Sequence, residues 1–128
     1  MNAMNYQIEV FDQYIRVSFV EGTVLTTGLF REVLTAERGK KEHKVLNDVW
    51  DMRGCAVDSG VNSESIALLV EFLKELHVPD LYHKKSAIVV ESELEYGISR
   101  IYQALTEALP FETEIFYSEE EATAWLFS

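Results

Sequence analysis

Residues 87–90 read AIVV, and this short run decides the fold. The run is apolar and largely β-branched, which is typical of a central strand. Amphipathic helical patterns lie on both sides of it, over Ile66–Leu76 and over Leu94–Leu109. A strand between two such helices indicates right-handed crossovers and a mostly parallel sheet covered by helices.

Strand patterns continue toward both ends of the chain. Apolar and polar residues alternate over 6–11 and over 15–19, with the polar pair Asp12-Gln13 between them, which predicts an opening β-hairpin. Val45–Met52 is a strand pattern with apolar residues on both faces except at two positions. Glu114–Tyr117 predicts the last strand.

The helical segments have recognisable ends. A first helix is expected around Leu29–Leu34 and a short last helix around Ala122–Leu126. The predicted N-caps are Thr26 or Thr27 for the first helix, Asn62 or Ser63 for the second, and Ser118, with Glu121 completing a capping box, for the last. The predicted stop residues are Gly39 for the first helix, Pro79 for the second and Pro110 for the third. The predicted fold is α/β, in the order β-β-α-β-α-β-α-β-α.

The length and charge of the chain limit the classes of function. Its 128 residues fit one domain, and a hydrophobic fraction of 48% is enough for one core. Acidic residues outnumber basic ones 22 to 11, and the net charge of −11 repels nucleic acid and anionic membranes. The grouped basic residues are expected to be solvated, at helix ends and strand entries: Arg38, Lys40, Lys41, Lys44, Lys84 and Lys85. We expect neither a nucleic-acid nor a membrane partner.

The sequence predicts a cytoplasmic protein. Cys55 is the single cysteine, so an internal disulfide is excluded and a reducing compartment fits. The first ten residues do not show the charged and then apolar pattern of a signal peptide. Apolar runs such as residues 66–70 are far shorter than a membrane span.

Three segments carry a resemblance to a known family. They are Trp50-Asp51-Met52-Arg53 after the third strand, AIVV followed by Tyr96-Gly97, and the ending EATAWL at residues 121–126. Together and in this order they resemble the SpoIIAA-like family of the STAS superfamily. The resemblance implies a single domain over residues 1–128, with helices packed mainly on one face of a mixed, mostly parallel sheet, and often a homodimer.

The resemblance also implies a function. The chain is similar to the STAS anti-sigma factor antagonists, which are non-enzymatic regulatory modules that bind protein partners. Members of that group are phosphorylated on a serine in the turn before a helix. The nearest match is Asp58-Ser59-Gly60, seven residues after Asp51. The candidate phospho-acceptor or partner loop therefore comprises Asp51, Asp58, Ser59 and Ser63. In the alternative interpretation, Ser59 only forms a turn and Asn62 or Ser63 only caps a helix.

Neither a metal site nor a catalytic group is expected. Five carboxylates are predicted at or near the ends of the third and fourth strands: Asp48, Asp51, Asp58, Glu91 and Glu93. Such a group can hold Mg²⁺ or Ca²⁺, but it has no ligand-spaced motif, and we interpret it as solvated loop charge. His43, His77 and His83 have no zinc spacing, and Cys55 is expected to be a loop or half-buried thiol. No nucleotide-binding glycine motif occurs, so no cofactor is predicted. The sequence shows no acid/base pair and no nucleophile–base pair, so no enzymatic activity is predicted.

Aromatic residues of two predicted helices and of the third strand indicate a second possible function. Trp50, Phe72, Tyr96 and Tyr102 are predicted to border an apolar pocket between the sheet and the helices Ile66–Leu76 and Leu94–Leu109. Such a pocket would suit a small apolar, lipid-like ligand. Aromatic residues at helical spacing are also typical of a core or a dimer contact. The sequence therefore predicts a regulatory protein-binding module, with a small-ligand carrier as the alternative.

Overall fold

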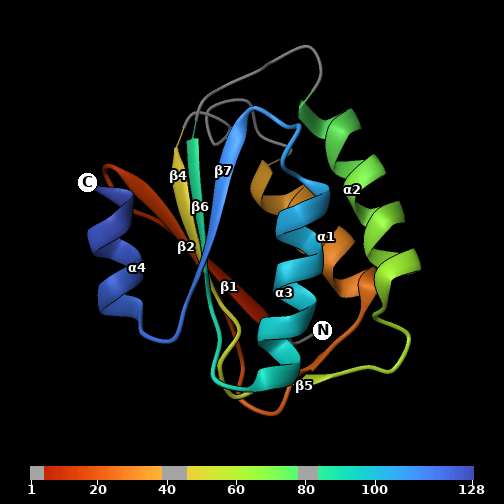
Figure 1. The fold of residues 1–128 in the computed structure, drawn as a ribbon. Helices are drawn as coiled ribbons and strands as arrows, with labels where there is room; N and C mark the ends of the chain where they lie inside the picture. The colour runs from red at the N-terminus through yellow and green to blue at the C-terminus, as the bar shows by residue number, and fades with distance from the viewer. Residues whose placement is uncertain (1–4, 39–45, 78–83) are drawn as a thin grey trace.

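A five-stranded mixed sheet forms the centre of the computed structural model, which describes residues 5–38, 46–77 and 84–128 (Figure 1). Its strands are β1 (Tyr6–Val10), β2 (Tyr14–Phe19), β4 (Asn47–Asp51), β6 (Lys84–Val89) and β7 (Phe111–Phe116), in the spatial order β1-β2-β4-β6-β7. β1 is antiparallel to β2, and each of the other neighbouring pairs is parallel. The predicted α/β class, opening hairpin and mostly parallel sheet are confirmed.

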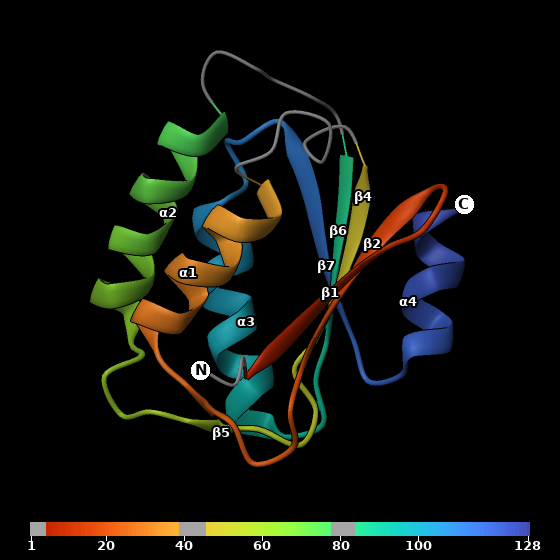
Figure 2. The same cartoon turned by 180° about the vertical axis from the view of Figure 1, so that it is seen from behind.

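Three of the four helices in the described residues cover one face of the sheet. These are α1 (Thr27–Arg38), α2 (Ser63–His77) and α3 (Glu93–Leu105), while α4 (Glu119–Leu126) covers the other face (Figures 1 and 2). Both views place α2 farther from the sheet than α1 and α3. None of the helices in the described residues is long and apolar enough to cross a membrane.

The alternation of side chains along the strands separates two cores. Toward α1, α2 and α3 the sheet presents Ile15, Val17, Trp50 and Ile88, and toward α4 it presents Val49, Ala87 and Val89, which pack on Ala122 and Leu126. Because both faces are covered, the central strands are apolar on both sides. The sequence pattern around residues 87–90 reflects this double coverage.

Two differences from the predicted elements have physical reasons. Strands β3 (Val24–Leu25) and β5 (Ala56–Val57) pair in parallel as a separate small sheet, and two residues are too few to show a period in sequence. The third helix ends at Leu105 rather than Leu109, because the backbone hydrogen bonds beyond it span three residues instead of four: the N–H groups of Glu107 and Leu109 donate to the carbonyl oxygens of Ala104 and Thr106 (3.4 and 2.9 Å).

Helix capping matches the sequence at three of four N-termini. Backbone N–H groups donate to the side chains of Thr26 (from Leu29, 3.0 Å), Asn62 (from Ser65, 3.0 Å) and Ser118 (from Glu121, 3.1 Å). The fourth N-cap, Ser92, was not anticipated: its hydroxyl accepts from the N–H of Glu95 (3.1 Å), and Glu95 Oε1 accepts from the N–H of Glu91 (2.9 Å). The expected stop residues Gly39 and Pro79 lie outside the described residues.

Replacing the cap of α3 tests this local account. Ser92→Ala is expected to lower the free energy of unfolding by about 1 kcal/mol, because the N–H of Glu95 loses its acceptor. Ser92→Asn, whose side chain caps equally well, is the matched control and is expected to lie within a few tenths of a kcal/mol of the parent. Urea denaturation followed by circular dichroism measures both; equal losses in the two variants would contradict the capping role.

Candidate functional site

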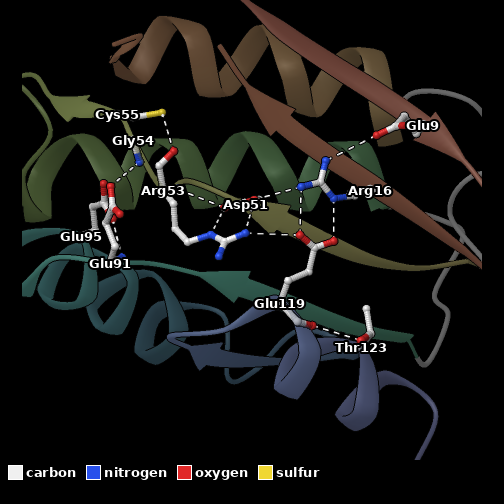
Figure 3. A network of polar contacts seen from close by, with 10 residues as sticks. All are labelled: Glu9, Arg16, Asp51, Arg53, Gly54, Cys55, Glu91, Glu95, Glu119 and Thr123. Atoms are coloured by element: carbon white, nitrogen blue, oxygen red, sulfur yellow. Dashed lines mark hydrogen bonds and ion pairs between the residues drawn. The ribbon is translucent and has the colours of Figure 1, made fainter. Parts of the chain in front are cut away.

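Asp51, at the C-terminal end of β4, lies between two arginines (Figure 3). Its Oδ2 accepts from Arg16 Nη2 (3.0 Å) and Arg53 Nη2 (2.9 Å), and its Oδ1 accepts from Arg53 Nε (2.9 Å). Arg16 also donates two hydrogen bonds to Glu119, the first residue of α4 (2.7 and 2.9 Å). This network joins β2, β4 and α4, and its donors and acceptors satisfy one another.

The electrostatics of Asp51 agree with a structural role. Burial alone would raise its pKa, but the hydrogen bonds from Arg53 and the charges of Arg53 and Arg16 hold the pKa below its ordinary value. The carboxylate is therefore ionised and paired at neutral pH. It has no property of a proton donor or of an open cation site.

The loop after Asp51 holds an unreactive thiol. The backbone N–H of Gly54 donates to Glu91, and the Cys55 thiol lies 3.8 Å from the carbonyl oxygen of Arg53 (Figure 3). Burial and the nearby carboxylates of Glu95, Asp51 and Glu91 raise the pKa of Cys55 to about 11. Cys55 is half-buried, as predicted, and is protonated at neutral pH.

The other residues of the predicted partner loop are exposed. Asp58 Oδ2 accepts from the N–H of Gly60 (2.9 Å) in a local turn, while Ser59 and Ser63 face solvent. The described residues contain no group of three or more His, Cys, Asp or Glu side chains placed to hold a metal ion. Phosphorylation of Ser59 or Ser63 stays a prediction, and His43 and His83 lie outside the described residues.

Four charged side chains are buried together on the opposite face of the sheet from Asp51. Glu37 and Arg38 end α1, Asp48 is the second residue of β4, and Lys84 is the first residue of β6. Their side chains are 0–1% exposed. The prediction that Asp48 and Asp51 belong to the solvated loop charges is therefore wrong, since both carboxylates are buried and paired. The prediction that Arg38 and Lys84 are solvated is wrong too. Lys40, Lys41 and Lys44 lie outside the described residues.

Asp48 is the centre of this buried ion cluster. Its Oδ2 lies 3.1 Å from Arg38 Nη2 and 3.3 Å from Lys84 Nζ, and its Oδ1 accepts from the Ser86 hydroxyl. Glu37 Oε1 accepts from Trp50 Nε1 (3.2 Å) and lies 3.4 Å from Arg38 Nε. The charged groups of this cluster compensate for burial by pairing, which a single buried charge cannot do.

The two carboxyl groups titrate in opposite directions. Burial would raise the pKa of Asp48, but the close charges of Lys84 and Arg38 hold it well below its ordinary value. Glu37 has longer contacts with the same two cations, so burial and the charge of Asp48 raise its pKa to about 8. Near neutral pH, Asp48 therefore carries the negative charge and Glu37 is largely protonated.

A pocket of about 60 Å³ adjoins the buried ion cluster. It lies between the sheet and α1, α2 and α3, and most of its wall is apolar, supplied by Phe30, Leu34, Met52, Ile66, Leu69, Ile88 and Ile98. Trp50 completes the aromatic part, and Arg38, Ser86, Ser99 and Tyr102 supply the polar part. Pattern alone did not indicate Arg38 or Ser99, because both read as surface residues of a helix.

Two of the four predicted pocket aromatics line this pocket. Trp50 and Tyr102 belong to its wall. Phe72 and Tyr96 do not line it: the Arg31 guanidinium covers the Phe72 ring at 4.3 Å, and Tyr96 stacks on Tyr117 with ring centroids 5.7 Å apart. Each of these two rings therefore has a partner outside the pocket.

Comparisons of the chain with protein-family models, with curated proteins and with solved structures found no match. The resemblance to the SpoIIAA-like family, the homodimer, the protein partner and the cytoplasmic location stay predictions. The function is therefore inferred from the side chains that the fold brings together.

The Asp51 network generates a prediction on stability. Asp51→Asn is expected to lower the free energy of unfolding by about 1–2 kcal/mol at pH 7, because two arginines lose a charged acceptor and both are partly solvated. The folded pKa of Asp51 is lowered, so its contribution is present above the unfolded pKa of about 3.9 and is lost as the pH falls through the folded pKa. The difference between variant and parent should shrink below about pH 4.

Chemical denaturation at pH 7 and pH 3 measures this difference. Asp58→Asn is the matched control, since Asp58 is exposed and an asparagine keeps its turn. A destabilisation by Asp51→Asn that is equally large at both pH values would contradict the electrostatic account.

Glu37 generates a prediction in which stability changes with pH in the opposite direction. Its folded pKa is raised above the unfolded value of about 4.3, so the stability that it contributes is full at low pH and is lost as the pH rises through about 8. Glu37→Gln cannot ionise. Between pH 5 and 8 the parent should therefore lose stability relative to this variant, by up to about 1.4 kcal/mol per pH unit, the limit for one proton.

Denaturation midpoints across that range measure the effect, with the exposed Glu75→Gln as the control. Parallel pH profiles for the parent and Glu37→Gln would show that Glu37 does not titrate in this range.

Proposed function

We propose that this protein binds a small, largely apolar molecule in the pocket beneath α1, α2 and α3. The observation that carries the proposal is a pocket of about 60 Å³ whose wall is formed mostly by apolar side chains of the core, such as Leu34, Leu69 and Ile88. A ligand that removes the apolar surface of this wall from water gains roughly 25 cal/mol for each Å² that it covers.

The volume of the pocket sets the size of the ligand. At about 10–30 Å³ for each water molecule, 60 Å³ holds roughly two to six waters, so the part of a ligand that enters the pocket is a compact group of few non-hydrogen atoms. A whole acyl chain is much larger than this. The pocket therefore supports a small-molecule ligand more directly than the lipid-like ligand considered from sequence.

The position of α2 supports access to the pocket. Ile66 and Leu69 of α2 form part of the pocket wall, and α2 lies on the outside of α1 and α3 (Figure 2). A small displacement of α2 would open the pocket without breaking a strand pairing. Ser63 is the first residue of α2, and the exposed turn at Ser59 precedes this helix, so an occupant of the pocket would act on the same helix that the regulatory hypothesis uses.

The geometry favours the pocket over the regulatory loop. Ser59 is exposed and so accessible to a kinase, but Asp58 and Glu64 lie close to it in sequence, and like charge opposes a phosphate. The pocket, by contrast, has a defined volume and wall. The regulatory function predicted from the family resemblance stays a second hypothesis, and a phosphate on Ser59 or Ser63, seen as a mass increment in the purified protein, would favour it.

Filling the pocket from within tests the proposed function. Leu69→Phe adds a ring to the pocket wall, and Leu68→Phe is the matched control because Leu68, the next residue, is 71% exposed. Titration with 1-butanol, which has five non-hydrogen atoms, is expected to shift the amide NMR signals of pocket residues in the parent and in Leu68→Phe. In Leu69→Phe these shifts should be at least tenfold weaker at the same concentration.

Two results would contradict the proposed function. One is equal binding by the parent and Leu69→Phe. The other is the absence of saturable shifts at pocket residues with 1-butanol and with charged probes of the same size.

A further inference from the structure

The outer edge of β7 is open along one side. β7 pairs only with β6 in the five-stranded sheet, and Figure 1 shows α3 on one side of β7 and α4 on the other. The carbonyl oxygen of Phe116 accepts from the N–H of Val90 (2.9 Å), so the even-numbered residues of β7 direct their backbone groups toward β6. The odd-numbered residues direct theirs outward, where the N–H groups of Thr113 and Ile115 have no partner among the described residues.

A groove of about 490 Å³ lies at this edge. Its walls come from the second half of α3, from residues 111–114 of β7 and from Trp125 of α4. Ala104 and Phe111 supply apolar surface on the side of α3, and Trp125 supplies it on the side of α4. The open strand edge therefore lies in a hollow with walls on both sides, which is the shape that receives an extended peptide.

Gln103 of α3 already makes one of the hydrogen bonds that an added strand would make. Its Nε2 donates to the outward carbonyl oxygen of Thr113 (2.6 Å) and to Glu114 Oε1 (3.2 Å), and its Oε1 accepts from Arg100 (2.9 Å). A side-chain amide carries the same N–H donor as a backbone amide. The edge of β7 is therefore within reach of an amide donor from outside the sheet.

The charges of the groove select its occupant. Among the described residues that line it, Glu107, Glu112 and Glu114 are acidic, whereas the one basic side chain, Arg100, is bonded to Gln103. Glu112 and Glu114 are exposed and, two positions apart, lie on the same face of β7. A second copy that paired its own β7 here would place like charges side by side, which is unfavourable. A strand with basic residues at alternate positions places a cation beside each glutamate.

We propose that the outer edge of β7 binds an extended, basic segment of another protein as an added strand. The backbone of that segment pairs with Thr113 and Ile115 and displaces the amide of Gln103, and its alternate lysine or arginine side chains contact Glu112 and Glu114. In this binding mode the backbone hydrogen bonds supply affinity and the alternate side chains supply specificity. The inference goes beyond the proposed function and does not depend on the pocket beneath α1, α2 and α3.

Peptides test the pairing of the backbone. The probe is a fluorescein-labelled peptide of alternating lysine and valine, one residue longer than the six residues of β7, and fluorescence anisotropy at pH 7 in about 0.15 M salt measures its binding. Two further peptides carry N-methyl groups on all the valine amides or on all the lysine amides, which keeps every charge. Because alternate N–H groups of a strand point in opposite directions, one of these two is expected to bind at least about tenfold more weakly and the other is not.

Charge variants of the protein test the contacts with the glutamates. The double variant Glu112→Gln and Glu114→Gln is expected to weaken binding of the lysine–valine peptide about three- to tenfold. The matched control is Glu64→Gln with Glu75→Gln, which changes the net charge equally at exposed positions of α2 outside the groove. It is expected to bind the peptide within about twofold of the parent. A peptide of alternating glutamate and valine is expected not to bind the parent.

Edge variants test the position of the added strand. Thr113→Pro removes an outward N–H that the pairing with β6 does not use, and proline is tolerated at such edge positions. It is expected to weaken binding at least about tenfold, whereas Thr113→Val keeps the N–H and is expected to bind like the parent. Gln103→Ala removes the competing donor and is expected to bind about two- to fivefold more tightly. Circular dichroism checks folding, and the N-methylated peptides serve as the test if Thr113→Pro does not fold.

Four results would overturn the inference. The first is equal binding of both N-methylated peptides and the unmethylated one, which would mean attraction by charge alone. The second is equal weakening by the two double glutamate variants. The third is a dimer, seen by sedimentation, that Thr113→Pro dissociates, which would assign the edge of β7 to a second copy. The fourth is no binding of the lysine–valine peptide. None of these results changes the test of the pocket with 1-butanol.

Discussion

The ion pair between Asp48 and Arg38, buried between α1 and the sheet, constrains the rest of the structure. Asp48 sits on β4, Arg38 ends α1, and Lys84 and Ser86 of β6 contact the same carboxylate. An unpaired buried charge costs several kcal/mol, so these four side chains fix one another's positions. The end of α1 is thereby held over the starts of two central strands.

The pocket lies beside that ion pair. Arg38 belongs to both, and the rest of the pocket wall comes from the sheet and from α1, α2 and α3. The network around Asp51 plays a different part, since it joins α4 to the other face of the sheet (Figure 3).

The sequence predicted the order and class of the elements because their apolar periods are strong and their caps are local. Residue pairs such as Ser118 and Glu121 are three positions apart, so capping can be read directly. Asp48 was misjudged because a carboxylate in a strand pattern reads as exposed. Side chains alternate between the two faces of a strand, so Asp48 lies on the same face as Trp50 and Met52, which are buried. This alternation is the signal that could have identified Asp48 as buried.

The pocket itself was only half predictable. Trp50 and Tyr102 were identified, but the partners that draw Phe72 and Tyr96 away from the pocket come from distant segments that one sequence does not connect. Arg38 and Lys84 were assigned to solvent for the same reason. They are 46 positions apart: the parallel pairing of β4 with β6 brings Lys84 to Asp48, and the packing of α1 on the sheet brings Arg38 there.

A crystal structure grown with 1-butanol, at a resolution that shows ordered solvent, tests the central claim most directly. The account predicts the alcohol in the pocket beneath α1, α2 and α3, with its alkyl group on the apolar wall. A pocket closed by its own side chains, or one that holds ordered water in the presence of 1-butanol, would contradict it.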